Sequence, residues 1–181
     1  HVLEAPIIPS SKYERYGSID WGRLAPFAWY AHIIKKEEHE GIKFNRIITF
    51  EEVYGTNKSP YEQAEEIQKK VDYRTINKTY IDPSAENRQP DGSVSIAKQF
   101  RFAFEDITGV RPQILPAKNE RPSRWAAMEN WMRIAPDGLP YWMITPNCKN
   151  LIRTIPEMMP DENKPEDIDT SLEDHAVDSV S

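Results

Sequence analysis

The sequence predicts an α/β domain built on a mixed β-sheet, in which three antiparallel strands are followed by strands that alternate with helices. Two observations predict this order. Runs rich in apolar, aromatic and β-branched residues over 16–19, 26–34 and 43–54 follow one another with only short turns between them. After residue 59, helical patterns and short strand patterns alternate. Such an alternation gives a mixed sheet that is flanked by helices on both faces.

The composition is that of one globular domain. With 181 residues, of which 39% are hydrophobic and 10% aromatic, the chain can bury a core of ordinary size. No run approaches the roughly 18 apolar residues of a membrane span, and no signal peptide is recognised. The start at His1 rather than Met suggests an excised domain or a processed product. The single cysteine, Cys148, excludes an internal disulfide and is expected to be a buried small hydrophobe.

The net charge of −6 argues at first against a nucleic-acid partner, but the acidity is confined to the end of the chain. Residues 157–181 hold nine acidic side chains against Lys164 alone, a charge of −8. Residues 1–156 therefore carry a charge of +2. A body so close to neutral neither supports nor excludes DNA as a partner.

The individual elements are predicted from local signals. Residues 1–15 are expected to form an extended entry segment, and residues 22–25 a tight connection between the first two strands. Residues 35–41 are expected to be a charged turn. Ser59 and Glu62 form a capping box at the start of the first helix. The later elements are a helix over 60–73, a strand over 75–84, a loop over 86–93, a helix over 95–107, a strand over 111–117, a helix over 122–134, a strand over 141–144, a helix over 147–159 and a final helix from 171.

Two aspartates are expected at the carboxyl ends of strands. Asp20 follows the first strand and precedes Gly22, and Asp82 ends the fourth strand where Pro83 stops the ladder. Taken alone, each carboxylate is more simply a turn cap. If the first and fourth strands are parallel neighbours, the two carboxylates lie together, and each raises the pKa of the other unless a cation neutralises them. A divalent ion with oxygen ligands is the natural partner for such a pair.

A third acid is expected from the end of the chain. Asp174, His175 and Asp178 have helical spacing, so that Asp174 and Asp178 share one face of a helix. A helix that brings them to the strand-end acids would complete a cluster of three carboxylates able to hold two metal ions. Two ions about 3.5–4 Å apart serve in-line attack on a phosphodiester, where one activates water and the other stabilises the leaving oxygen.

Four segments, taken together and in this order, carry a family resemblance. They are Ile19-Asp20-Trp21-Gly22, Tyr80-Ile81-Asp82-Pro83-Ser84, residues 144–152 and Glu173-Asp174-His175-Ala176-Val177-Asp178. With them the chain resembles the C-terminal nuclease domain of the large terminase subunit of tailed bacteriophages. The resemblance extends from about Tyr16 to Asp178, and the closing motif is its most specific part. It implies a ribonuclease-H-like fold over residues 16–181 as a single domain, without the family's ATPase motor domain.

The resemblance also implies an activity and its partners. The activity would be that of an endonuclease that depends on two Mg²⁺ or Mn²⁺ ions and cuts concatemeric double-stranded DNA with little sequence specificity. Asp20, Asp82 and Asp178 would be the catalytic and metal-binding acids, with His175 as an auxiliary ligand and Asp174 as the alternative acid if the last helix is rotated. Double-stranded DNA, the ATPase domain of the full-length chain, the portal and the small terminase subunit would be its partners, in the host cytoplasm at the assembling procapsid and with no membrane.

Five basic residues are candidates for contacts with DNA phosphates, namely Arg88, Lys98, Lys118, Arg121 and Arg124. Arg88 and Lys98 flank the loop after Asp82, and the other three cluster before the predicted helix over 122–134. Phosphate contacts would be insensitive to sequence, and ordinary solvated surface is an equally good interpretation of each residue. Glu51 and Glu52 are expected to be exposed strand charges, with a further acid near the site as the alternative.

Two other functions stay open on the sequence. The chain could be another ribonuclease-H-like nuclease, such as a junction resolvase, which a comparison of branched with linear DNA would test. It could instead be a docking module that holds DNA or a portal ring with little or no cleavage of its own. The near-neutral charge of residues 1–156 suits weak intrinsic affinity for DNA.

Overall fold

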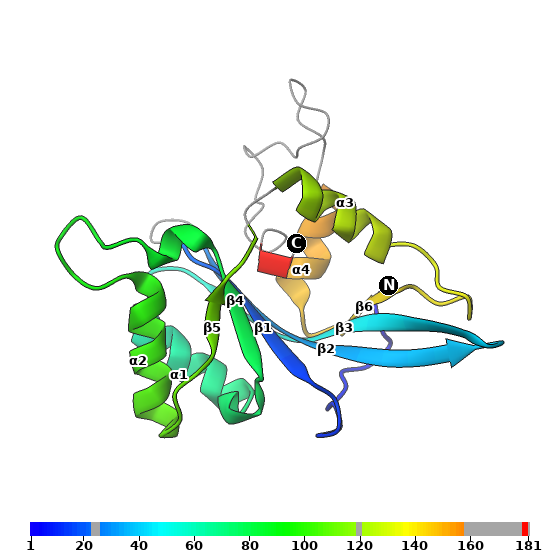
Figure 1. Ribbon diagram of the computed structural model, residues 1–181, viewed down its shortest axis with the longest axis horizontal. Helices are drawn as coiled ribbons and strands as arrows, with labels where there is room; N and C mark the ends of the chain where they lie inside the picture. Colours follow the sequence, from blue (N-terminus) through cyan, green and yellow to red (C-terminus); the bar gives the residue numbers. More distant parts are fainter. Residues whose placement is uncertain (23–25, 119–120, 158–178, 181) are drawn as a thin grey trace.

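A six-stranded mixed sheet forms the centre of the computed structural model, which describes residues 1–22, 26–118, 121–157 and 179–180 (Figure 1). Its spatial order is β5-β4-β1-β2-β3-β6. The strands are β1 (Arg15–Asp20), β2 (Phe27–His39), β3 (Ile42–Gly55), β4 (Lys78–Ile81), β5 (Ile114–Pro116) and β6 (Trp142–Ile144). Strands β1, β2 and β3 are antiparallel in succession, while β4 pairs parallel to β1, β5 to β4 and β6 to β3. The predicted mixed sheet is therefore confirmed.

Helices cover both faces of this sheet, as predicted (Figure 1). The larger core lies between one face and the helices α1 (Pro60–Lys70) and α2 (Ile96–Thr108). A smaller core lies on the other face, beneath α3 (Arg121–Trp131) and α4 (Lys149–Thr154). Among the described residues, no helix is long and apolar enough to cross a membrane.

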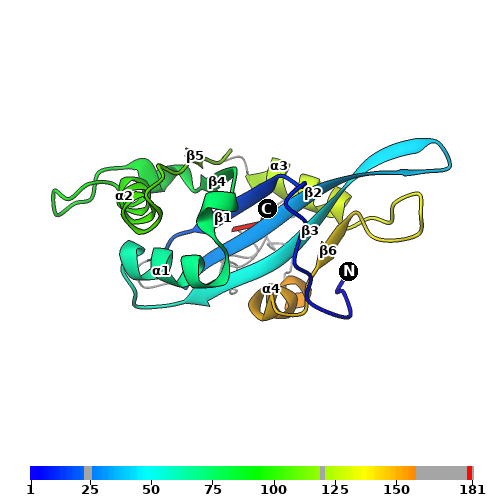
Figure 2. The same cartoon turned by 90° about the horizontal axis from the view of Figure 1, so that it is seen from below.

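Strand β2 continues through most of the residues predicted to be a charged turn. The prediction of a turn over 35–41 is wrong, because β2 runs to His39 and the turn itself contains only Glu40 and Gly41. Both turn residues have positive φ, 49° and 79°, which a two-residue hairpin turn requires. The charged side chains remain compatible with a strand because this part of the β2–β3 hairpin is a ribbon that projects beyond the sheet, as Figure 2 shows.

Other elements differ from prediction mainly at their ends. Strand β4 is shorter than the predicted 75–84 because 3₁₀ helices adjoin it, η1 (Tyr73–Thr75) before and η2 (Pro83–Glu86) after. The capping box at Ser59 is present as predicted. The helix predicted over 147–159 is α4 followed by a third 3₁₀ helix, η3 (Ile155–Glu157). The helix predicted from residue 171 to 178 lies outside the described residues.

The entry segment reaches the sheet edge beside β6. The amide of Leu3 donates to the carbonyl of Ile144 at 2.8 Å, and the amide of Ile144 donates to the carbonyl of His1 at 2.8 Å. Val2 accordingly forms an isolated parallel bridge with Ile144. These first residues of the segment protect the edge that β6 would otherwise present.

Gly17 in β1 is required by the close approach of β4. A Cβ atom at this position would lie 2.5 Å from the hydroxyl oxygen of Thr79 and 3.1 Å from the indole nitrogen of Trp29. The Thr79 hydroxyl is itself fixed by a 2.6 Å hydrogen bond with the hydroxyl of Tyr73. We expect Gly17→Ala to lower the free energy of unfolding by about 1–3 kcal/mol, since the core must shift to admit the methyl group. Urea titration measures the change.

Gly55 provides the matched control for this substitution. It ends β3, and an added Cβ would meet nothing within 4 Å. Gly55→Ala should therefore change the free energy of unfolding by less than about 0.5 kcal/mol. Equal losses in the two variants would show that the contact with Thr79 is not the cause.

Candidate active site

The structure brings Asp20 and Asp82 together. The parallel pairing of β1 with β4 ends at the pair Ile19–Ile81, so the two aspartates occupy the next, equivalent positions of adjacent strands. Neighbouring strands lie about 4.8 Å apart. Because Ile19 and Ile81 are buried in the larger core, side-chain alternation directs Asp20 to the opposite face. The two conditions that the sequence argument needed, adjacency and parallel direction, are both met.

A 3₁₀ turn orients the carboxylate of Asp82. One of its oxygens accepts a 2.7 Å hydrogen bond from the amide of Ser84, which makes Asp82 the N-cap of η2. The turn is in turn tied to α2 and β5, because Arg101 pairs with Glu86 and donates to the carbonyl of Ile114 at 2.6 Å. The cap that sequence reasoning offered as the simpler reading is thus present, and it holds the carboxylate in a defined direction. Asp20 and Asp82 are both half-buried.

Asp178, the third predicted acid, lies outside the described residues, as do His175 and the alternative acid Asp174. Ser179, which follows Asp178 in the sequence, is described and buried. The Ser179 hydroxyl lies 3.2 Å from that of Ser18 and donates to the carbonyl of Ala28 at 3.3 Å. Ala28 is the β2 partner of Asp20. The residue that follows Asp178 is therefore held next to Asp20.

Two carboxylates alone do not form a metal cage. Among the described residues, no group of three His, Cys, Asp or Glu side chains could hold a metal ion. The pair at the ends of β1 and β4 fits an oxygen-liganded divalent ion in its chemistry, since carboxylates are the ligands that Mg²⁺ and Mn²⁺ prefer. A complete site needs at least one further ligand, and the chain segment that precedes Ser179 is rich in acids.

A half-buried histidine that sequence reasoning did not single out lies on the same face of the sheet. His32 in β2 forms hydrogen bonds with the hydroxyls of Ser18, at 3.0 Å, and Thr49, at 2.9 Å. Burial lowers the pKa of His32 from 6.5 to about 4. The ring is consequently neutral at pH 7, and its two nitrogens have distinct roles as donor and acceptor.

Acid should destabilise the protein through His32. Because its folded-state pKa is lowered, the unfolded chain binds a proton that the folded protein excludes between about pH 6.5 and pH 4. The contribution of His32 to stability is therefore complete above pH 6.5 and is lost as the pH falls toward 4, by roughly 3 kcal/mol in all. Urea titrations across this range should show a steeper pH dependence for the wild type than for His32→Asn. The exposed His39, replaced by glutamine, should leave the wild-type dependence unchanged.

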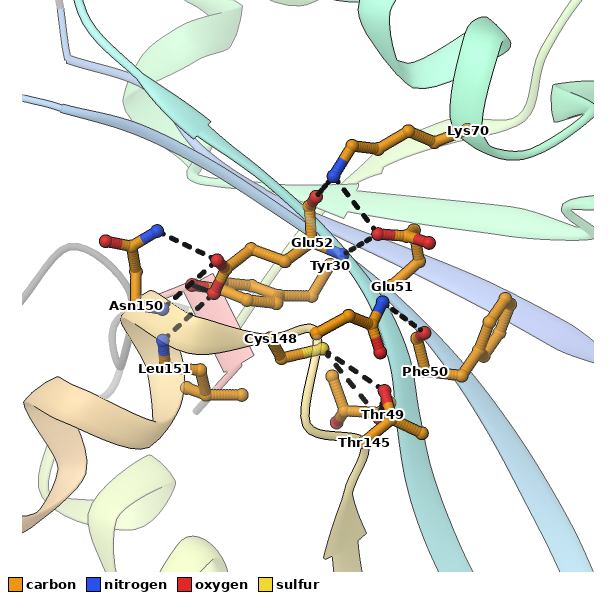
Figure 3. A network of polar contacts seen from close by, with 11 residues as sticks. Tyr30, Thr49, Phe50, Glu51, Glu52, Lys70, Thr145, Cys148, Asn150 and Leu151 are labelled. Carbon is orange, nitrogen blue, oxygen red and sulfur yellow. Dashed lines mark hydrogen bonds and ion pairs between the residues drawn. The ribbon is translucent and has the colours of Figure 1, made fainter. Parts of the chain in front are cut away.

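Glu52 corrects the expectation of an exposed strand charge. Its side chain is buried and accepts hydrogen bonds from the Tyr30 hydroxyl at 3.0 Å and from the amides of Asn150 and Leu151 at 3.1 and 2.9 Å (Figure 3). These amides belong to the first turn of α4, so the carboxylate caps that helix. The side-chain amide of Asn150 adds a further bond at 2.8 Å. Burial and the Glu52 carboxylate together raise the pKa of the Tyr30 hydroxyl.

Lys70 extends this network to Glu51, the residue before Glu52. Lys70 donates to the backbone carbonyl of Glu52 at 2.6 Å and pairs with the Glu51 carboxylate at 3.2 Å (Figure 3). Cys148 is fully buried, and burial raises the pKa of its thiol to about 12. The prediction that Cys148 is a buried small hydrophobe is confirmed. The Glu52 carboxylate, through the amides of Asn150 and Leu151, links the first turn of α4 to β3.

The predicted DNA-contact residues fall into separate groups. Arg88 and Lys118 are exposed and follow the carboxyl ends of β4 and β5, the edge where Asp82 lies. Lys98 is on α2, under the opposite face, with its ammonium 5.4 Å from the ring centre of Phe102. The remaining two, Arg121 and Arg124, belong to the first turn of α3. Their part in DNA binding stays a prediction.

Comparison with solved structures identifies the fold. The nuclease domain of the P22 large terminase matches with a TM-score of 0.71 and 12% identity, over 99% of this chain and 83% of that one. The large terminase from a thermophilic bacteriophage, in complex with ADP, matches with a TM-score of 0.64 and 19% identity, over 99% of this chain and 40% of that one. Another crystal form of that protein gives a TM-score of 0.62 at 18% identity.

The chain matches solved structures, but no protein-family model and no curated protein matches it. The chain spans about 40% of the length of the large terminase from the thermophilic bacteriophage. At these identities the likeness is one of fold, and in fold it agrees with the resemblance stated from the sequence. The chain has the fold of a large terminase nuclease domain.

Proposed function

We propose that this chain is the metal-dependent endonuclease domain of a viral DNA-packaging terminase, and that it cleaves concatemeric double-stranded DNA with little sequence specificity. The observation that carries the proposal is the placement of Asp20 and Asp82 at equivalent ends of two adjacent parallel strands. The likeness in fold to large terminase nuclease domains supports the choice of substrate. In the full-length protein, the partners would be an ATPase domain, the portal and the small terminase subunit, and the site of action the host cytoplasm at the procapsid.

Asp20, Asp82 and Asp178 would hold one or two Mg²⁺ or Mn²⁺ ions, with His175 as an auxiliary ligand and Asp174 as the alternative to Asp178. The ions, when bound, would supply the activation of water and the stabilisation of the leaving oxygen that phosphodiester hydrolysis requires. The chain's own contribution is positional. The Ser84 amide directs one oxygen of Asp82, and the pairing of β1 with β4 fixes its separation from Asp20.

Substrate contacts would come from the basic residues at the same edge. Arg88 and Lys118 follow the strands that end beside the acids, and Arg121 and Arg124 begin the helix on the acid-facing side of the sheet. Such contacts would be with phosphates, which explains low sequence specificity. Lys98, on the other side, is the weakest of the five candidates.

Plasmid cleavage tests the proposal directly. Supercoiled plasmid is incubated with the protein in EDTA, Mg²⁺ or Mn²⁺, and nicked and linear products are separated on a gel. We expect cleavage with millimolar metal and none with EDTA. Full protection of the plasmid with both metals would reject an intrinsic nuclease and favour the docking module. Preferential cutting of four-way junctions over linear duplex of the same length would favour a resolvase.

A further inference from the structure

Two exposed apolar side chains lie side by side on the acid-facing side of the sheet. Tyr80 in β4 and Leu115 in β5 are partners in the parallel ladder, and each is 38% exposed. Their strand neighbours Ile81 and Ile114 are buried in the larger core. Side-chain alternation therefore directs the exposed pair to the opposite face, on which Asp20 lies. We call these two side chains the β4–β5 strip.

The smaller core does not extend to the β4–β5 strip. Among the described residues, the strand side chains of that core come from β2, β3 and β6. Strands β4 and β5 lie at the other end of the sheet from β6 (Figure 1). The ring of Tyr80 therefore presents part of its flat apolar surface to a ligand, which is how aromatic side chains contribute to binding sites.

The β4–β5 strip lies one ladder step from the candidate acids. Tyr80 precedes Asp82 by two residues, and Ser18, the β1 partner of Tyr80, precedes Asp20 by two residues. A strand rises about 3.3 Å per residue, so the Cα atoms of Tyr80 and Asp82 are about 7 Å apart along β4. One strand of a duplex advances about 3.4 Å per nucleotide. A base over Tyr80 would therefore lie about two nucleotides from a phosphate held at the acids.

Positive side chains flank the β4–β5 strip on both sides. The exposed Lys78 precedes Tyr80 on β4, while the exposed Arg88 and Lys118 follow the carboxyl ends of β4 and β5. None of these three cations forms an ion pair within the described part of the chain. An exposed aromatic ring between cations complements a nucleic-acid strand, whose bases stack on the ring while its phosphates meet the charges.

The geometry favours an unpaired strand over a duplex. Inside a duplex both faces of each base are covered by the neighbouring base pairs, so only a base that has left the stack can lie on an aromatic side chain. We propose that the β4–β5 strip is a stacking platform for an unpaired base next to the cleaved phosphodiester, and that the chain prefers locally unpaired DNA. In its bearing on cleavage, this inference rests on the function proposed above.

DNA binding without metal tests the platform separately from cleavage. A short fluorescein-labelled single strand and the duplex of the same sequence are each titrated with protein in EDTA, and anisotropy gives the affinities. Tyr80→Ala removes the ring, and Tyr80→Phe retains it. Tyr61→Ala is the matched control, because Tyr61 is 43% exposed and belongs to α1, on the opposite face of the sheet. A second assay compares Mn²⁺-dependent nicking of a duplex with a mismatched bubble and of a fully paired duplex.

We expect Tyr80→Ala to bind the single strand about tenfold more weakly than the wild type, because stacking of one base contributes roughly this factor to affinity. Its affinity for the duplex should be nearly unchanged. Tyr80→Phe and Tyr61→Ala should bind both probes as the wild type does. The wild type should nick the bubble faster than the paired duplex, and Tyr80→Ala should lose this preference.

Equal single-strand affinities for Tyr80→Ala and Tyr61→Ala would overturn the platform, and continued cleavage of plasmid by both would leave the nuclease intact. Equal weakening of single-strand and duplex binding in Tyr80→Ala would also overturn it, since the ring would then not distinguish unpaired bases. Single-strand binding that depends on Tyr80, in a protein that cuts no DNA with either metal, would support the platform and reject the proposed function.

Discussion

Replacing Asp82 with asparagine should reduce Mn²⁺-dependent DNA cleavage by about 10³-fold or more. Asparagine caps a helical turn as well as aspartate does, so the bond to the Ser84 amide and the turn η2 should survive. Only the negative charge is lost. If that charge holds a metal ion in the transition state, its removal costs several kcal/mol, and each 1.4 kcal/mol is a factor of ten in rate. Initial rates of plasmid nicking at saturating Mn²⁺ measure the effect.

Asp72→Asn is the matched control for Asp82→Asn, because both aspartates cap 3₁₀ helices. Asp72 caps the 3₁₀ helix η1 just before β4, as Asp82 caps η2 just after it, and its side chain accepts from the amide of Arg74. The Arg74 guanidinium lowers the pKa of Asp72 to about 2, so this carboxylate is also charged. Asp72→Asn should cleave DNA at close to the wild-type rate, because it lies at the other end of β4. Similar rates for both variants would mean that Asp82 is a cap and nothing more.

Asp20→Asn should lose activity to the same degree as Asp82→Asn, and the double variant should be little worse than either single one. Groups that act as a unit are not additive, since one missing ligand already disables the site. Unchanged unfolding transitions for all three proteins would show that the loss is chemical. Additive losses of activity would instead indicate that the two carboxylates act independently.

Glu52→Ala should lower the free energy of unfolding by about 3–5 kcal/mol. The substitution leaves the Tyr30 hydroxyl and the amides of Asn150 and Leu151 buried without their acceptor. Each unpaired buried donor costs about 1–3 kcal/mol. For a domain of this size the loss corresponds to a fall in Tm of roughly 10 °C. Thermal unfolding followed by circular dichroism measures it.

Glu51→Ala separates this network from a general effect of charge on β3. Glu51 is adjacent in sequence, but its side chain is half-buried and pairs with Lys70 near the surface. Its loss should cost less than about 1 kcal/mol. If both glutamate variants unfolded at the same temperature, the capping of α4 by Glu52 would not be the source of the stability.

The order of the sheet could be predicted because its strands carry strong local patterns. The apolar runs before Asp20 and around Trp29 are buried as strands, and Pro83 does end β4. The adjacency of Asp20 and Asp82 followed from topology alone. The turn predicted over 35–41 failed because charge was taken to mean loop, although a projecting ribbon keeps charged side chains in water while its backbone remains paired.

The polar groups of the site region could not be located in this way. His32 and Ser18 look like ordinary strand residues, and only the register of β1, β2 and β3 shows that they meet. A β-bulge between Ala31 and His32 shifts that register, so that Thr49 rather than Phe50 is opposite His32. Alternation of residue types carries no signal for a bulge. Glu52 was missed for a similar reason, because its partners on α4 are almost 100 residues away.

The projecting β2–β3 ribbon offers a convenient attachment point for a spectroscopic label. Its turn at Glu40 is twelve residues from Ala28, the β2 partner of Asp20, and a strand rises about 3.3 Å per residue. A dye there would be on the order of 40 Å from Asp20. Cys148, the single cysteine of the chain, is buried with a poorly reactive thiol. Glu40→Cys should therefore react selectively with maleimides, giving a singly labelled protein whose fluorescence anisotropy tests the proposed DNA binding without a probe at the candidate site.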